Sequence, residues 1–77
     1  MEFWLLTEKG RGQVREAERE AINDEAKIIV LLDRIGSATI EEIARKTGLT
    51  EYNVKIYLKR LSEKTLVRKK TTKFTAF

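Results

Sequence analysis

Apolar residues recur through much of the chain at intervals of three or four, the spacing that places side chains on one face of an α-helix. The clearest series is Ile28, Leu31, Leu32 and Ile35. Asn23 or Asp24 precedes this series and can cap a helix, and Gly36 follows it and suits a helix C-terminus. The pattern predicts a helix between these signals, with its apolar stripe in the core.

Two further helices joined by a short turn are predicted after Gly36. Thr39 and Glu42 match a capping box, in which the two residues satisfy each other's backbone N–H groups. A helix is therefore predicted from about Ile40 to Thr47. Gly48 interrupts the helical pattern, and the next apolar series predicts a helix from about Glu51 to Lys64.

The two ends of the chain predict shorter elements. Glu2–Leu6 is apolar and aromatic and predicts a short strand or extended arm, followed by a thin amphipathic helix over Arg11–Ile22. Near the C-terminus, the β-prone run Thr65–Arg68, the polar run Lys69–Lys73 and the aromatic run Phe74–Phe77 predict a hairpin. The N-terminal strand is expected to join this hairpin or to cover a neighbouring subunit.

The segment Thr39–Thr50 resembles the helix-turn-helix of winged-helix transcriptional regulators of the MarR and ArsR type. Leu61–Val67 is similar to the end of their recognition helix as it enters the wing, although Lys64 and Thr65 stand where a glycine is usual. Leu6–Arg11 resembles the segment that leaves a wing and enters a helix, but here it precedes the motif.

The resemblance implies a mainly α fold with a small β-hairpin, arranged as a winged helix-turn-helix with an N-terminal strand and helix. We expect residues 1–25 to form an extension that completes the core or mediates association, and residues 26–77 to form the winged helix-turn-helix domain. In this arrangement the helix over residues 51–64 enters the major groove, and a basic wing over residues 65–77 contacts the DNA backbone.

Composition narrows the possible functions. The chain has 77 residues without cysteine or histidine, which excludes disulfides, thiolate or imidazole metal sites and His-based catalytic triads. Its carboxylates alternate with Lys and Arg along the helices, as on a solvated surface. We therefore expect no enzyme activity, metal or cofactor. No apolar run approaches the ~20 residues that span a bilayer, and no signal peptide is apparent, so a cytoplasmic protein is expected.

Charge is distributed unevenly along the chain. Residues 1–26 carry four Lys or Arg against seven Asp or Glu, a net charge of −3, whereas residues 27–77 carry twelve against five, a net charge of +7. A basic half joined to an acidic half is expected of a nucleic-acid binder with a separate scaffold or association segment. A solvated surface that happens to be basic is the alternative.

Seven candidate DNA-binding residues lie on the outward side of the helix over residues 51–64. The stripe Val54, Tyr57, Leu58 and Leu61 is expected to face inward. The outward set is Glu51, Tyr52, Asn53, Lys55, Ile56, Lys59 and Arg60. Asn53 suits adenine, Tyr52 and Ile56 suit a thymine methyl group, and the three cations suit phosphates or guanine. An ordinary solvated helix face with isolated apolar side chains is the alternative.

The predicted wing supplies four more candidates, Arg68, Lys69, Lys70 and Lys73. They are expected to contact phosphates or to lie over the minor groove, which positions the protein without reading sequence. The alternative is that they protect an edge strand from aggregation.

We expect a DNA-binding transcriptional regulator that acts as a homodimer. The rival interpretation is a winged helix used for protein–protein interaction in a larger complex, since this fold supports many functions. RNA binding is a lesser possibility. Convergence of the cations on one face favours DNA, whereas an acidic N-terminal helix folded across the recognition helix favours a protein partner.

Overall fold

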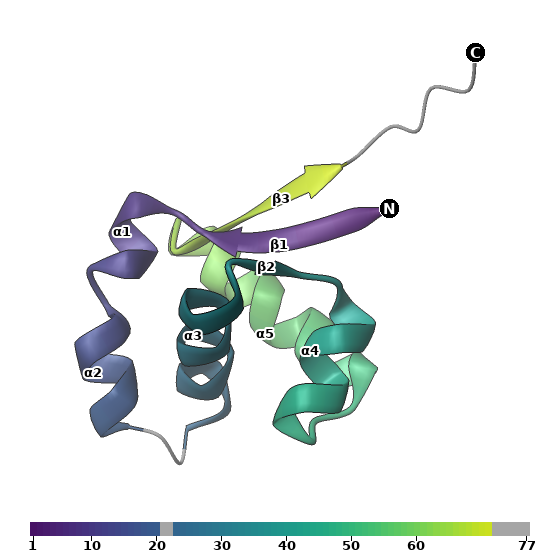
Figure 1. Ribbon diagram of the computed structural model, residues 1–77, viewed down its shortest axis with the longest axis horizontal. Helices are drawn as coiled ribbons and strands as arrows, with labels where there is room; N and C mark the ends of the chain where they lie inside the picture. The colour runs from purple at the N-terminus through teal and green to yellow at the C-terminus, as the bar shows by residue number, and fades with distance from the viewer. Residues whose placement is uncertain (21–22, 72–77) are drawn as a thin grey trace.

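The computed structural model describes residues 1–20 and 23–71 and shows a small, mostly helical fold of the winged-helix kind with a three-stranded antiparallel sheet. Helices α3, α4 and α5 lie on one side of the sheet (Figure 1). In chain order the elements are β1 (Glu2–Leu6), α1 (Glu8–Arg11), α2 (Val14–Arg19), α3 (Asp24–Ile35), β2 (Ser37–Ala38), α4 (Ile40–Thr47), α5 (Glu51–Glu63) and β3 (Val67–Thr71). Among the described residues, no helix is long and apolar enough to cross a membrane.

The three central helices begin where short polar side chains cap them. The side chain of Asn23 accepts from the Glu25 backbone N–H at 2.9 Å. Thr39 accepts from the N–H of Glu42 at 3.2 Å, which confirms this half of the predicted capping box. Each such bond satisfies an N–H group that the helix itself leaves without a partner. The predicted bounds of α3 and α4 are confirmed, and α5 ends one residue earlier than predicted.

The single helix predicted over Arg11–Ile22 is wrong, because two short helices occupy this segment. The side chain of Thr7 accepts from the Gly10 N–H at 3.0 Å and starts α1 at Glu8, before the amphipathic pattern begins. Gly12 ends α1, and the residue before α2, Gln13, makes no side-chain capping bond. Glycine at the junction favours a break over a continuous helix. The predicted last residue, Ile22, lies outside the described residues.

The predicted C-terminal hairpin also needs correction. Strand β3 continues through the expected turn to Thr71 and pairs with β1, so the sheet order is β2-β1-β3. Leu6 faces Val67 across this antiparallel pair. The segment Lys69–Lys73 has no Gly, Asn or Pro to form a tight turn, and its threonines suit a strand. The expected strand Phe74–Phe77 lies outside the described residues.

The core gathers around α3 and includes residues from every layer. The largest fully buried side chains are Ile28, Leu32, Ile43, Leu58, Leu61, Val54 and Val67. Leu6 of β1 and Ala17 of α2 are also buried. The two N-terminal elements therefore pack into the same core as the helix-turn-helix.

The end of α5 is closed by a Schellman motif, in which the residues after the helix bond back to its last carbonyls. The N–H of Leu66 donates to the Leu61 carbonyl and the N–H of Thr65 to the Ser62 carbonyl, each at 2.9 Å. Thr65 has the left-handed φ of 59° that the motif requires. Thr65 thus adopts the left-handed conformation at the turn where a glycine is usual.

Thr7 ties this turn to the N-terminal segment. Its N–H donates to the Leu66 carbonyl at 3.0 Å, and its hydroxyl donates to the Thr65 carbonyl at 2.6 Å. Gly10 is buried against the Leu66 carbonyl, and a Cβ atom on Gly10 would clash with the oxygen of that carbonyl. The junction between β1 and α1 therefore holds the start of β3 in place beside α5.

Candidate nucleic-acid interface

The turn between α4 and α5 sets the direction of the candidate recognition helix. Gly48 has a left-handed φ of 80°, and its N–H donates to the Ala44 carbonyl at 2.9 Å. Ile43 and Ala44 are buried, and Leu49 in the turn is half-buried. A left-handed residue after α4 lets the chain turn sharply. The small Ala44 side chain occupies little space on the buried side of α4.

One side of α5 is buried and the opposite side is fully accessible. Val54, Leu58 and Leu61 are at most 1% exposed. All seven residues expected to face outward are exposed: Glu51, Tyr52, Asn53, Lys55, Ile56, Lys59 and Arg60. The predicted orientation of α5 is confirmed, and none of these side chains is needed for the core.

Two large apolar side chains interrupt the polar face of α5. Tyr52 is 73% exposed and Ile56 is 36% exposed. They are four residues apart and so are neighbours on the helix surface. Met1 is the one other large hydrophobic residue that is exposed in the described part of the chain. Tyr52 and Ile56 together give α5 an apolar contact area between its charged groups.

Tyr57 fixes the rotation of α5 against α3. Its ring is half-buried, and its hydroxyl donates to Asp24 Oδ2 at 3.0 Å. The hydrogen bond to Asp24, followed by partial burial, raises the pKa of Tyr57 above its usual value of 10.0. The expectation that Tyr57 faces inward is confirmed, with its ring half-buried.

The basic residues of β3 are divided between the two faces of the sheet, because successive side chains of a strand point to opposite sides. Val67 is buried among the helices, and Lys69 shares its face, whereas Arg68 and Lys70 lie on the opposite face. All three cations are exposed. Lys69 Nζ pairs with Glu2 Oε2 at 3.3 Å. The fourth predicted wing residue, Lys73, lies outside the described residues.

A cleft of about 370 Å³ separates the outer end of β1 from the first turns of α4 and α5. We call it the β1–α5 cleft, and its lining residues are Met1, Glu2, Thr39, Ile40, Glu41, Glu51 and Lys55. Lys55 lines its α5 side, and Glu2, the partner of Lys69, lines its β1 side. Lys55 therefore lines the cleft directly, whereas Lys69 is connected to it only through its ion pair with Glu2.

Acidic side chains in the β1–α5 cleft are a feature that the sequence interpretation did not single out. Glu41 and Glu51 lie in the first turns of α4 and α5, and Glu2 lies at the start of β1. Carboxylates are favoured in a first helical turn because the N-terminal end of a helix is electropositive. The sequence therefore contained a signal for the positions of Glu41 and Glu51 at the starts of their helices. Their proximity to Glu2, however, depends on how the strands pair.

Helix α2, which carries two arginines and two glutamates and so has no net charge, does not cover this surface. It packs beside α3, on the opposite side of that helix from α4 (Figure 1). Within residues 1–20 and 23–71, no group of acidic side chains is arranged to hold a metal ion. The accessible face of α5 and the outer end of the sheet remain the candidate interface.

Comparison with known proteins places the helix-turn-helix segment in a family. No curated protein and no solved structure matches the chain. The family model described as FaeA-like protein matches residues 24–73. This match runs from the start of α3 through α4, α5 and β3, and it covers more than half of the chain. The chain therefore belongs to the FaeA-like protein family.

Proposed function

We propose that this protein binds double-stranded DNA and regulates transcription, with α5 in the major groove. The observation that carries the proposal is the exposed outer face of α5, which combines cations, an amide and two apolar side chains. The helix-turn-helix holds this face outward, and no other described element covers it. The FaeA-like match is consistent with a small regulator-type domain.

Within α5, the N-terminal residues suit contacts with base edges. Asn53 and Tyr52 lie in the first turn, where recognition helices usually meet bases. Asn53 has the amide geometry that recognises adenine, and Glu51 can accept a hydrogen bond from the amino group of cytosine. Lys59 and Arg60, farther along the helix, suit phosphates. This division assigns sequence reading to the start of α5 and anchoring to its second half.

The outer end of the sheet supplies further phosphate contacts in this proposal. Arg68, Lys69 and Lys70 are exposed on β3. Lys69 is held to Glu2 at 3.3 Å, and an exposed pair of this kind is weak enough to exchange for a phosphate. Contacts of this type position a protein on DNA without selecting a sequence.

A titration of duplex DNA at several salt concentrations tests the proposal. Each neutralised phosphate releases counterions and contributes a log–log slope of about −0.9. Four or more contacts from α5 and β3 would therefore give a slope of about −3.6 or steeper. Weak binding that salt barely changes would contradict the proposal.

Substitutions separate base reading from phosphate contact. Asn53→Ala should lower the preference for a selected site over random DNA by about 1–3 kcal/mol. Lys69→Ala combined with Lys70→Ala should weaken both DNAs about equally and reduce the salt slope by about one unit per lost contact. Arg15→Ala, on the exposed side of α2, is the matched control and should change neither the preference for the selected site nor the salt slope. Circular dichroism confirms that each variant is folded.

Protein–protein interaction is the second candidate function, and the acidic residues of the β1–α5 cleft favour it. Glu2, Glu41 and Glu51 oppose the approach of phosphates. If DNA occupies this side of the molecule, Glu41→Gln should increase DNA affinity about two- to fivefold, the effect of removing one exposed like charge. If the substitution leaves DNA affinity unchanged and a folded Asn53→Ala variant binds normally, a protein partner becomes the better explanation.

A further inference from the structure

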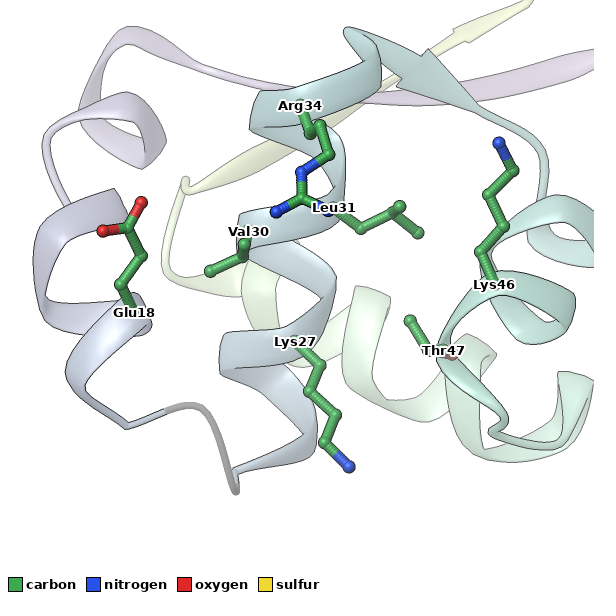
Figure 2. Close-up of a pocket in the computed structure, with 7 residues that line it drawn as sticks. All are labelled: Glu18, Lys27, Val30, Leu31, Arg34, Lys46 and Thr47. Carbon is green, nitrogen blue, oxygen red and sulfur yellow. The ribbon is translucent and has the colours of Figure 1, made fainter.

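A second surface lies over α3, between α2 and α4, and it includes no residue of α5 or of the sheet. It is a hollow of about 320 Å³, which we call the α3 hollow (Figure 2). Its lining residues are Glu18, Lys27, Val30, Leu31, Arg34, Lys46 and Thr47. The hollow is separate from the candidate nucleic-acid interface and takes no part in the proposed DNA contacts.

The floor of the α3 hollow is apolar. Val30 extends from α3 toward α2, and Leu31 extends toward α4 (Figure 2). Both are only partly buried. The hydroxyl of Thr47 donates to the Ile43 carbonyl at 2.6 Å, so this residue adds mainly its methyl group to the lining. The floor therefore offers apolar contact area that the protein's own core leaves partly uncovered.

Cations border this floor, and most of their charge is uncompensated. Lys27 pairs with Asp24 at 3.8 Å. Neither Arg34 nor Lys46 makes an ion pair with any carboxylate in the described part of the chain. Figure 2 shows the Arg34 guanidinium over α3, between Val30 and Leu31, and Lys46 on α4, on the other side of Leu31. Leu31 thus lies between two unpaired positive charges.

The opposite wall of the hollow has the reverse sign. Glu18, on α2, is the one carboxylate that lines it and makes no ion pair with a described residue. An anion in the hollow is therefore attracted toward Arg34 and Lys46 and repelled from the α2 wall. The charges favour an orientation in which the negative group lies near Leu31, between the two cations, and away from Glu18.

We propose that the α3 hollow binds a small amphipathic carboxylate, with its carboxylate at Arg34 and Lys46 and its apolar body on Val30 and Leu31. Guanidinium and ammonium groups are the usual protein partners of carboxylates. The volume is at the lower end for small-molecule sites, and α2 and α4 stand on either side of the floor, which suits a compact ligand better than a flat protein surface.

Titration with 1-naphthoate, followed by ¹H–¹⁵N NMR on the full chain without DNA, tests the proposal. We expect fast-exchange shift changes centred on Leu31 and Lys46, with a Kd on the order of 1 mM for a ligand of about 13 non-hydrogen atoms at an open site. 1-Naphthamide, which has the same shape without the charge, should bind at least about threefold more weakly. Equal binding of the two compounds, or changes centred elsewhere, would overturn the proposal.

Three exposed substitutions sharpen this test. Lys46→Gln and Arg34→Gln should each weaken 1-naphthoate binding about two- to fivefold, whereas Glu18→Gln should strengthen it by a similar factor. None should change 1-naphthamide binding. Lys59→Gln on α5 is the matched control, and unchanged binding is expected. Opposite effects of Glu18→Gln and Lys46→Gln support the proposed orientation, and equal effects would contradict it.

Duplex DNA is the competing polyanion for these cations. If Lys46→Gln and Arg34→Gln lower DNA affinity as much as Lys59→Gln does, while 1-naphthoate causes no shifts at Leu31, the α3 hollow belongs to the DNA surface and the proposal fails. Because the naphthoate titration contains no DNA, its result does not depend on whether the proposed DNA function is correct.

Discussion

Thr65 is the one described residue other than glycine that has a positive φ. A β-branched side chain is strained in the left-handed region, and this strain costs about 1–2 kcal/mol. The conformation persists because the Schellman motif and the bond from the Thr7 hydroxyl both use backbone groups of this turn. The strain can therefore be relieved without losing those bonds.

Thr65→Gly should raise the free energy of unfolding by about 0.5–1 kcal/mol, because the strain relieved exceeds the entropy that glycine gains in the unfolded chain. Urea unfolding monitored by circular dichroism measures the difference. Ser62→Gly, in the last turn of α5, is the control and should destabilise by up to about 1 kcal/mol. A Thr65→Gly variant no more stable than the parent protein would contradict this account.

Gly10 and Gly12 should respond oppositely to alanine. Gly10→Ala places a Cβ atom against the Leu66 carbonyl oxygen, and the resulting backbone shift should cost about 1–3 kcal/mol. Gly12 is exposed with a helical φ of −66°, so Gly12→Ala should change stability by less than about 1 kcal/mol. Thermal unfolding measures the stability of both variants. Equal losses of stability would show that Gly10 does not lie in close contact with the Leu66 carbonyl.

Tyr57 makes stability depend on pH in the alkaline range. Its hydrogen bond to Asp24 requires the protonated phenol, so its pKa in the folded protein is raised above the unfolded value near 10. The bond therefore contributes fully below pH 10, and its contribution falls as the pH rises through the folded pKa. The stability difference between the parent protein and Tyr57→Phe should shrink in urea unfolding above pH 10. A pH-independent difference would exclude this linkage.

At the scale of elements, β1 is the centre of the sheet although it comes first in the chain. It pairs with β2 on one side and with β3 on the other. Leu5 faces Ser37 in one pair and Arg68 in the other. Removing this strand would leave two strands that do not pair with each other, and it would take Leu6 out of the core.

Leu5→Pro should therefore cost at least about 2 kcal/mol, because proline cannot donate to the ladder of a central strand. Small domains have little stability to spare, so a large loss of melting temperature is expected by circular dichroism. Thr71→Pro, at the end of edge strand β3, is the control and should cost less than half as much. Comparable melting temperatures for the two variants would mean that β1 does not organise the sheet.

At the scale of the whole molecule, one copy presents a single candidate recognition helix, α5, of 13 residues, which would serve one DNA half-site. Phe3 and Leu5 add apolar area on the face of the sheet opposite to the buried Leu6. Homodimers are the commonest way to join two such half-sites. We therefore expect sedimentation equilibrium to give about twice the chain mass of 9.0 kDa at high micromolar concentration. A mass of one chain under these conditions would refute the dimer.

The local signals of the chain were enough to predict α3, α4 and α5 and the outward face of α5. Each begins at a capping side chain, and glycines with positive φ follow α3 and α4. These effects act between residues at most four positions apart, so they can be recognised in a linear pattern. The exposure of Tyr52 and Asn53 follows from the same periodicity once Val54 and Leu58 are assigned to the core.

Only the tertiary structure decided which strands pair and which charges meet. The pairing of Leu6 with Val67 joins residues from opposite ends of the chain, and no local pattern identifies β1 as the partner of β3. The β1–α5 cleft and the α3 hollow arise in the same way, since Glu2 and Lys55 line one cleft, and Glu18 and Lys46 line one hollow, only after the helices and strands have packed. Such contacts depend on the burial of a shared core, and burial is a property of the whole chain.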